Sequence, residues 1–441
     1  MLSNIVKKIG IVTCIMLVTS CSLFSEDKDL PKGKRISIVD SKYDINSDST
    51  KKLSTVPQAV VINDWEQNGA NSAHSVGNIA GAESVNKIWS ANFGKGENKR
   101  NILLAQPIIT GGNVYTQDVN GTVSAFNLAD GQKIWKKKIK PLNKNISDNG
   151  LNGAGIATDG NSIFAVTGYG SIVSFDTKTG KQLWHNETNG LIRTAPTVCN
   201  DKLIIQTLDN RLLVLNKTDG SEIFRYNTSA EDTVLAGGAT PACSDKLNII
   251  VTGFSNGQLE AFNADIGYPL WSANLINAKR GNATTNINAI KAAPVIDHEI
   301  IYAIGNNDMF SAIDYKTGET IWAKEIGSTN TPWVSGDYVY VVSNNNDLVC
   351  LNKKNGEIVY TSNILNEYKL EERRDIYLTG PIMVNNKLLI TASNGMFYIV
   401  SPTNGKIERK IDTKGKIPYS PISAQDTIIV TNSDATITAY K

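Results

Sequence analysis

One sequence unit recurs along most of the chain, and this repetition limits the folds that the chain can adopt. Each copy contains an apolar strand-like segment, a turn rich in Gly, Asn or Asp, a second such segment and a turn that ends in Gly, as in Ile163–Trp184. The turn glycines are spaced 38 to 51 residues apart, at Gly131, Gly180, Gly220, Gly267, Gly318, Gly356 and Gly405. This period, built from short β-branched segments, predicts the blades of a β-propeller and does not fit a helical repeat.

Each turn glycine has characteristic neighbours. Four residues before it stands a short polar side chain, which can hydrogen-bond the following backbone and start the turn. Four residues after it stands an aromatic side chain, which we interpret as a structural wedge between neighbouring blades. The predicted wedge residues are Trp135, Trp184, Phe224, Trp271, Trp322 and Tyr360, with Trp89 as a further one near the start of the repeats. In the last such unit Arg409 takes the aromatic position.

Eight pairs of central strands predict eight blades, but the last blade lacks a fourth strand of its own. The sequence stops directly after the third strand of that blade, Thr436–Tyr440. A matching fourth strand, Lys87–Ala91, occurs at the beginning with no turn before it. We therefore expect an all-β fold over residues 57–441, an eight-bladed propeller of four-stranded antiparallel blades closed by the N-terminal strand. Closure of the ring removes an unpaired strand edge.

The first residues predict an export signal. Lys7 and Lys8 precede an apolar stretch that is too short to span a bilayer. The stretch ends in Leu-Val-Thr-Ser-Cys, which is typical of a lipobox, so the signal peptide is expected to cover residues 1–20 and the lipid to be attached to Cys21. The alternative is an ordinary cleaved signal with an incidental Cys.

The residues after the cleavage site favour attachment to the outer membrane. Ser22, rather than Asp, follows the lipidated Cys, and this favours delivery to the periplasmic side of the outer membrane. Several acyl chains on one Cys hold a protein firmly at a membrane. Residues 21–56 are polar and charged without sustained periodicity, so we expect them to form a flexible tether.

The repeat resembles the pyrroloquinoline-quinone (PQQ) type of β-propeller repeat over residues 62–441, and Asp64–Gly69 also fits that superfamily. The lipobox, the tether and the eight blades together are similar to the BamB family, and Lys316–Ser328 is the best-matching stretch. The resemblance implies a non-catalytic scaffold of the β-barrel assembly machinery, without a cofactor, that aids the folding and insertion of outer-membrane β-barrel proteins. Its implied partners are BamA, other subunits of the machinery and unfolded outer-membrane proteins.

The same resemblance implies a partner-binding loop. In BamB proteins, a loop with apolar residues ending in Arg, before the first proline of a blade, contacts BamA. Leu191, Ile192 and Arg193 match this pattern, with a shorter spacing to the proline. Alternatively, Arg193 is part of an inner strand of the repeat. An acidic pair of the family falls on Ala289 and Lys291 here, so this part of the interface is absent or its partner differs.

Residues for catalysis or metal binding are scarce. The histidines, His74, His185 and His298, lack ligand spacing, and no P-loop or nucleophile motif is found. Quinoprotein dehydrogenases share the repeat but hold their quinone with a vicinal disulfide, and this chain has no Cys-Cys pair. A PQQ-dependent dehydrogenase is therefore disfavoured, whereas a generic binding propeller for another envelope protein or a glycan stays an alternative.

The charge balance argues against a nucleic-acid partner. The formal net charge is +2, and removal of the signal peptide with Lys7 and Lys8 leaves a neutral chain. Such a chain lacks the basic surface that nucleic-acid binding requires.

Two features outside the repeat are less constrained. Cys199 and Cys243 follow the first prolines of consecutive blades but differ in register by one residue, so they should face opposite sides of their strands. We therefore expect buried thiols here and at Cys350, with a disulfide as the alternative. Glu367–Asp375 is expected to be a solvated loop, and Trp333 is either an exposed contact or a core residue.

Overall fold

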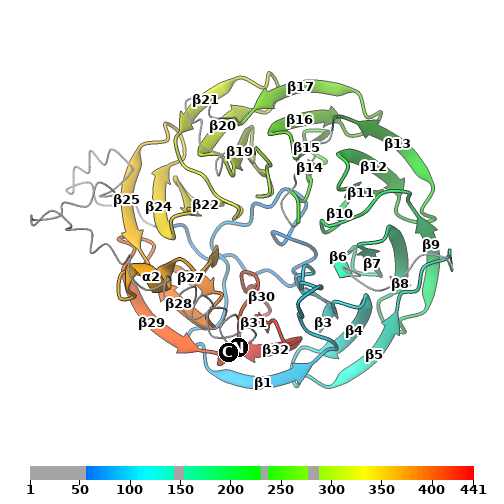
Figure 1. Ribbon diagram of the computed structural model, residues 1–441, viewed down its shortest axis with the longest axis horizontal. Coiled ribbons are helices and arrows are strands. Elements are labelled where there is room, and N and C mark those ends of the chain that lie inside the picture. The colour runs from blue at the N-terminus through cyan, green and yellow to red at the C-terminus, as the bar shows by residue number, and fades with distance from the viewer. Residues whose placement is uncertain (1–55, 144–152, 230–236, 277–287) are drawn as a thin grey trace, which may run out of the picture. The chain divides into compact units, whose positions relative to one another are not determined.

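The repeats form blades around a central axis, as Figure 1 shows. The structure is a computed structural model that describes residues 56–143, 153–229, 237–276 and 288–441. The predicted signal peptide, Cys21 and the tether up to residue 55 lie outside these residues. The described residues form eight four-stranded antiparallel sheets, which confirms the predicted eight-bladed, all-β propeller.

In seven blades the strands follow the chain order from the centre outward. Blade 1 contains β2 (Ile108–Thr110), β3 (Asn113–Gln117), β4 (Thr122–Asn127) and β5 (Lys133–Lys138); blade 2 contains β6 (Gly153–Thr158), β7 (Ser162–Thr167), β8 (Ser171–Asp176) and β9 (Gln182–Glu187). Blade 3 contains β10 (Thr197–Cys199), β11 (Lys202–Gln206), β12 (Arg211–Asn216) and β13 (Glu222–Asn227); blade 4 contains β14 (Ala242–Ser244), β15 (Ile249–Gly253), β16 (Gln258–Asn263) and β17 (Pro269–Asn274). Blade 5 contains β18 (Val295–Asp297), β19 (Ile300–Gly305), β20 (Met309–Asp314) and β21 (Thr320–Lys324); blade 6 contains β22 (Trp333–Ser335), β23 (Tyr338–Val342), β24 (Asp347–Asn352) and β25 (Ile358–Asn363). Blade 7 contains β26 (Leu378–Val384), β27 (Lys387–Ala392), β28 (Met396–Val400) and β29 (Ile407–Asp412).

Blade 8 is built from both ends of the propeller domain. It contains β30 (Ile422–Ala424), β31 (Thr427–Asn432), β32 (Thr436–Tyr440) and, as its outer strand, β1 (Lys87–Asn92). β1 pairs antiparallel with β32, from Lys87 opposite Tyr440 to Asn92 opposite Thr436. This pairing confirms the predicted closure by the N-terminal strand.

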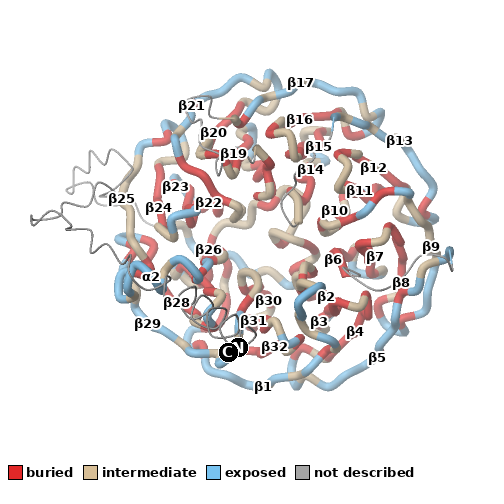
Figure 2. Tube along the Cα trace, viewed as in Figure 1, coloured by how far each residue is buried: buried red, intermediate tan, exposed pale blue. Residues whose placement is uncertain are grey.

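Burial follows the position of a strand within its blade. The inner and middle strands are buried and the outer strands are exposed (Figure 2), because each outer strand has one unpaired edge on the outside of the ring. In β7 all residues after Ser162 are buried, whereas in β5 only Trp135 is. The apolar, β-branched middle strands therefore supply most of the core.

The aromatic residues after the turns connect each blade to the next. Trp89, Trp135, Trp184, Phe224, Trp271, Trp322 and Tyr360 lie against Gly131, Gly180, Gly220, Gly267, Gly318, Gly356 and Gly405, respectively. The close approach needs glycine, since a Cβ on Gly131 would lie 2.6 Å from the Trp89 ring, and its φ is +71°. The indole of Trp89 also donates a hydrogen bond to Leu128 O at 2.9 Å. At the last junction Arg409 replaces the ring and donates to Ser84 O at 2.6 Å.

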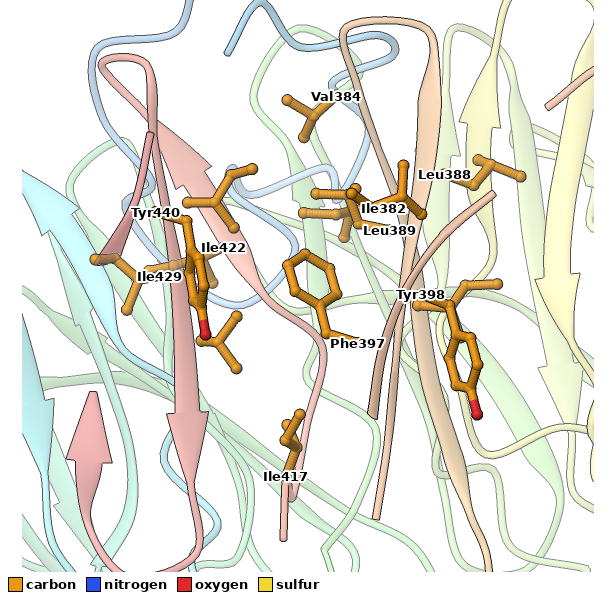
Figure 3. Packing of buried hydrophobic residues seen from close by; sticks show 14 of the residues in the cluster. Ile382, Val384, Leu388, Leu389, Phe397, Tyr398, Ile417, Ile422, Ile429 and Tyr440 are labelled. Atoms are coloured by element: carbon orange, nitrogen blue, oxygen red, sulfur yellow. The ribbon is translucent and has the colours of Figure 1, made fainter. Parts of the chain in front are cut away.

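Blade 8 packs on blade 7 through a continuous apolar layer. Figure 3 shows Phe397 of β28 directed toward Tyr440 of β32, and their ring centroids are 6.0 Å apart. Leu389 and Ile429 belong to the same buried cluster. The closing blade is thus joined to its neighbour by core packing as well as by the β1 pairing.

Residues 62–79 make a circuit inside the ring, in the blue segment of Figure 1, and contact every blade. Ile62 O accepts a hydrogen bond from Gln425 in blade 8, and Ile79 bonds Met383 and Asn385 in blade 7. Contacts with blades 1 to 6 follow in chain order, through Trp65–Ile109, Glu66–Thr158, Gln67–Val198, Ser72–Cys243, Ala73–Ile296 and Gly77–Trp333. Almost all these partners are on inner strands, so the segment forms a floor across one end of the central channel.

Cys199 and Cys243 form a disulfide, so the expected buried free thiols were wrong for this pair. The bond joins β10 of blade 3 to β14 of blade 4, whose Cα atoms at these cysteines are 6.2 Å apart. Neighbouring blades pack with opposite faces toward each other. Two cysteines that point to opposite sides of their own strands can therefore meet between the blades. Cys350 is a buried free thiol.

The charged insertion before blade 7 contains a single helical turn. α2 (Leu370–Arg373) has no buried residue, and Glu367 beside it pairs with Lys410. The expected solvated loop is therefore partly helical but exposed.

Candidate partner-binding site

The central channel is closed at one end and lined by loops at the other. The inner strands run in the same direction around the ring, so the loops that precede them gather at the end opposite the floor. A cavity of about 430 Å³ lies between, with Trp65 and His74 on the floor and Arg193 and Lys291 on the loops. We call the loop end the channel rim, defined by the segments 188–196, 237–241 and 288–294 that precede β10, β14 and β18.

Leu191, Ile192 and Arg193 are neighbours with different environments. Leu191 is 48% exposed, and its carbonyl accepts a hydrogen bond from Leu208 N at 2.7 Å. Ile192 is fully buried and forms an isolated bridge with Thr207. Arg193 is half-buried at the rim, and its Nε has no hydrogen-bond partner among the described residues. The loop is thus fixed through Ile192, with Leu191 exposed to solvent and Arg193 half-buried beside it.

The rim brings Arg193 and Lys291 to one surface. Both residues line the same small crevice between blades 3, 4 and 5. Ala289 is buried, and burial lowers the pKa of Lys291. The two segments singled out in the sequence therefore belong to one surface, a relation that their separation along the chain does not reveal.

Two residues named in the sequence, Trp333 and His74, are buried at the floor. Trp333 is buried, stacks on Trp65 with ring centroids 6.4 Å apart and donates from Nε1 to Gly77 O at 2.8 Å. It is therefore a core residue rather than an exposed contact. His74 is 1% exposed, and its Nδ1 donates to Pro294 O at 2.8 Å.

The buried His74 predicts a pH-dependent stability. Burial lowers its pKa to about 4, partly offset by the hydrogen bond to Pro294. Between pH 6.5 and about 4 the unfolded chain binds a proton at this position that the folded protein does not. We therefore expect this group to lower the free energy of unfolding by about 3 kcal/mol as the pH is lowered from 6.5 to about 4.

Urea unfolding at successive pH values measures this contribution. His74→Asn suits the positive φ of 57° and should reduce the pH slope. His298→Asn is the matched control, since His298 has a φ of 56° but an exposed side chain. Equal slopes in the His74→Asn variant and the wild type would contradict the assignment.

The remaining histidines and acids do not form a metal site in the described part of the chain. No three His, Cys, Asp or Glu side chains there come together as possible ligands. In the same residues no helix is long and apolar enough to cross a bilayer.

The closed ring and its turn glycines with aromatic partners define an eight-bladed propeller of PQQ-type repeats. Solved structures of this fold include BamB from Moraxella catarrhalis, with a TM-score of 0.68 and 19% identity over 81% of this chain and 99% of that chain. The quinohemoprotein alcohol dehydrogenase from Comamonas testosteroni has the same TM-score, with 13% identity over 87% of this chain and 81% of that chain. At these identities the likeness shows the fold alone.

The sequence comparisons identify the family. The family model of outer membrane protein assembly factor BamB matches residues 119–362, more than half of the chain, and the chain belongs to this family. The assembly factor BamB of Yersinia pestis is 23% identical over 361 residues, which cover 81% of this chain and 89% of that protein. BamB of Escherichia coli K12 is 24% identical over 353 residues, covering 79% and 87%.

Proposed function

We propose that the protein is a non-catalytic scaffold that docks on BamA through the channel rim and aids folding and insertion of outer-membrane β-barrel proteins. The observation that carries this is an exposed Leu191 beside Arg193, on a loop held in place by the buried Ile192. Eight interlocked blades keep such a loop rigid, which limits the entropy lost on binding. Relatives named as outer membrane protein assembly factors support the proposal.

A quinone-dependent enzyme fits these residues poorly. The dehydrogenases with this fold hold the quinone against a disulfide between adjacent cysteines. Here Cys199 bonds Cys243, which is 44 residues away and in another blade. Protein contact is therefore the function that the rim supports best.

Affinity capture from native membranes tests the docking. We expect BamA to be recovered with the wild-type protein. Leu191→Ala and Arg193→Ala should each weaken binding by about 1–2 kcal/mol, since exposed apolar and Arg side chains at a binding centre have effects of this size. Leu183→Ala is the matched control, because Leu183 is similarly exposed (52%) but lies on the outer strand β9.

The buried neighbour separates loss of contact from loss of fold. Ile192→Ala should lower the free energy of unfolding by about 2–5 kcal/mol, whereas Leu191→Ala should change it by less than about 0.5 kcal/mol. If BamA is captured equally by all these variants, the contact lies elsewhere. If another envelope protein is captured instead of BamA, the generic binding propeller is supported.

We further propose that a lipid on Cys21 holds the protein at the periplasmic face of the outer membrane. The cleaved signal covers residues 1–20, and residues 21–56 form the tether. Cys21→Ala should release the protein into the soluble fraction or leave an uncut precursor, as measured by membrane fractionation and immunoblotting. A variant that fractionates with the outer membrane like the wild type would show that the anchor is elsewhere.

A further inference from the structure

Arg193 and Lys291 come from blades that are not neighbours, yet they lie on either side of one backbone segment. Gly237, which precedes blade 4, lies between the loop of blade 3 and the loop of blade 5. A Cβ on Gly237 would be 3.3 Å from Lys291 Cε and 3.9 Å from Arg193 O. The end of the Lys291 side chain and the backbone carbonyl of Arg193 therefore both lie beside Gly237.

Neither cation has a carboxylate partner in the described part of the chain. Arg193 Nε is buried there without a hydrogen-bond partner, and Lys291 has no ion pair. Half-buried lysines elsewhere do have partners: Lys353 pairs with Asp297 at 2.9 Å, and Lys217 pairs with Asp159 at 3.0 Å. Burial without a counter-ion also explains the direction of the Lys291 pKa shift, which desolvation alone causes. An unpaired cation in such a place is costly unless a ligand supplies the negative charge.

The crevice that Arg193 and Lys291 line adjoins the channel cavity, which both residues also line. Gly237 and Gly238 leave the backbone bare there, and a Cβ on Gly238 would already be 2.8 Å from Thr194 Cγ2. Both cations line the 430 Å³ cavity as well as the crevice between the blades.

We propose that the channel rim binds an acidic, extended protein segment that places a carboxylate between Arg193 and Lys291. The exposed Leu191 supplies an apolar contact for a neighbouring side chain of that segment. The inference rests on the proposed function in one respect, since it takes the rim as the docking face. It adds the charge of the partner: an acidic segment, matched to two cations.

Two probes test the proposal. The first is the purified periplasmic part of BamA from the same organism. The second is a fluorescein-labelled peptide of alternating Glu and Val, compared with the same peptide carrying Gln for Glu. We expect the Glu peptide to bind more tightly than the Gln peptide by about tenfold, and its affinity to fall as salt is raised.

Substitutions connect this binding to the two cations. Arg193→Gln with Lys291→Gln should weaken BamA and the Glu peptide by about tenfold or more and remove the preference for Glu over Gln. Lys291→Arg should retain the preference, because the charge stays. Lys354→Gln with Lys406→Gln removes the same charge from exposed turns outside the rim and should have no effect. Circular dichroism and thermal unfolding verify that each variant is folded.

The outcomes separate this inference from the proposed function. If BamA binds the wild type and the Arg193/Lys291 double variant equally, the docking function holds and the acidic-segment proposal is wrong. If BamA does not bind at all, the docking function is wrong, and the peptides decide the present proposal. Equal binding of the Glu and Gln peptides, or no binding of either, would then overturn it.

Discussion

A chain that begins at Gly94 is expected to lose the soluble, monomeric fold. It lacks the outer strand β1 of blade 8 and the whole floor segment. Removing Trp65 alone takes away a ring that is 1% exposed, and large-to-Ala changes at such positions cost about 3–5 kcal/mol. Because the β1 pairing is lost as well, we expect the free energy of unfolding to fall by more than about 5 kcal/mol, which is comparable with the entire stability of many domains.

The truncation should expose the edge of β32 and cause aggregation. Size-exclusion chromatography and thermal unfolding measure the effect against a control chain that begins at Val56. Addition of a peptide covering residues 57–93 should restore part of the monomer, because both the floor and β1 are contained in it. A stable monomer from the truncated chain alone would show that closure does not depend on the N-terminal segment.

The fold could be predicted because its determinants are local and repeated. Each turn glycine and the aromatic residue that follows it occur within a few residues, as with Gly180 and Trp184, and every copy strengthens the same pattern. Closure was predictable as well, since Trp89 marks an outer strand that has no blade of its own. These features depend on periodicity and strand composition, which are visible without knowledge of distant contacts.

The floor segment could not be predicted in the same way. Residues 62–79 occur once, and their partners are distributed over all eight blades. The burial of His74 depends on that path rather than on neighbouring residues. The proximity of Arg193 and Lys291 likewise depends on loop conformations that no period specifies. The sequence indicates the loop Leu191–Arg193 as a candidate, which stays a prediction, but it indicates neither the burial of Ile192 nor the shared crevice of Arg193 and Lys291.

The disulfide illustrates how a correct local inference can lead to a wrong conclusion. The one-residue difference in register between Cys199 and Cys243 predicts that they face opposite sides of their strands, which within one sheet would keep them apart. The two strands belong to consecutive blades, however, and Thr197 Oγ1 donates to Pro241 O at 2.6 Å across the same interface. The floor segment also contacts the disulfide, since Cys243 N donates a hydrogen bond to Ser72 O at 2.7 Å.

Replacing both cysteines by Ser is expected to lower the free energy of unfolding by about 2–4 kcal/mol. The bond joins residues 44 apart in sequence, and cross-linking a loop of this length restricts the unfolded chain by an amount of that order. Urea unfolding with and without a reductant provides an internal control. The reductant should bring the wild-type midpoint to that of the Cys199→Ser/Cys243→Ser variant and leave the variant unchanged. Thiol labelling shows whether the reductant has opened the disulfide. If the bond is open and the wild-type urea midpoint is unchanged, the chain is equally stable without the bond, and a stabilising role is contradicted.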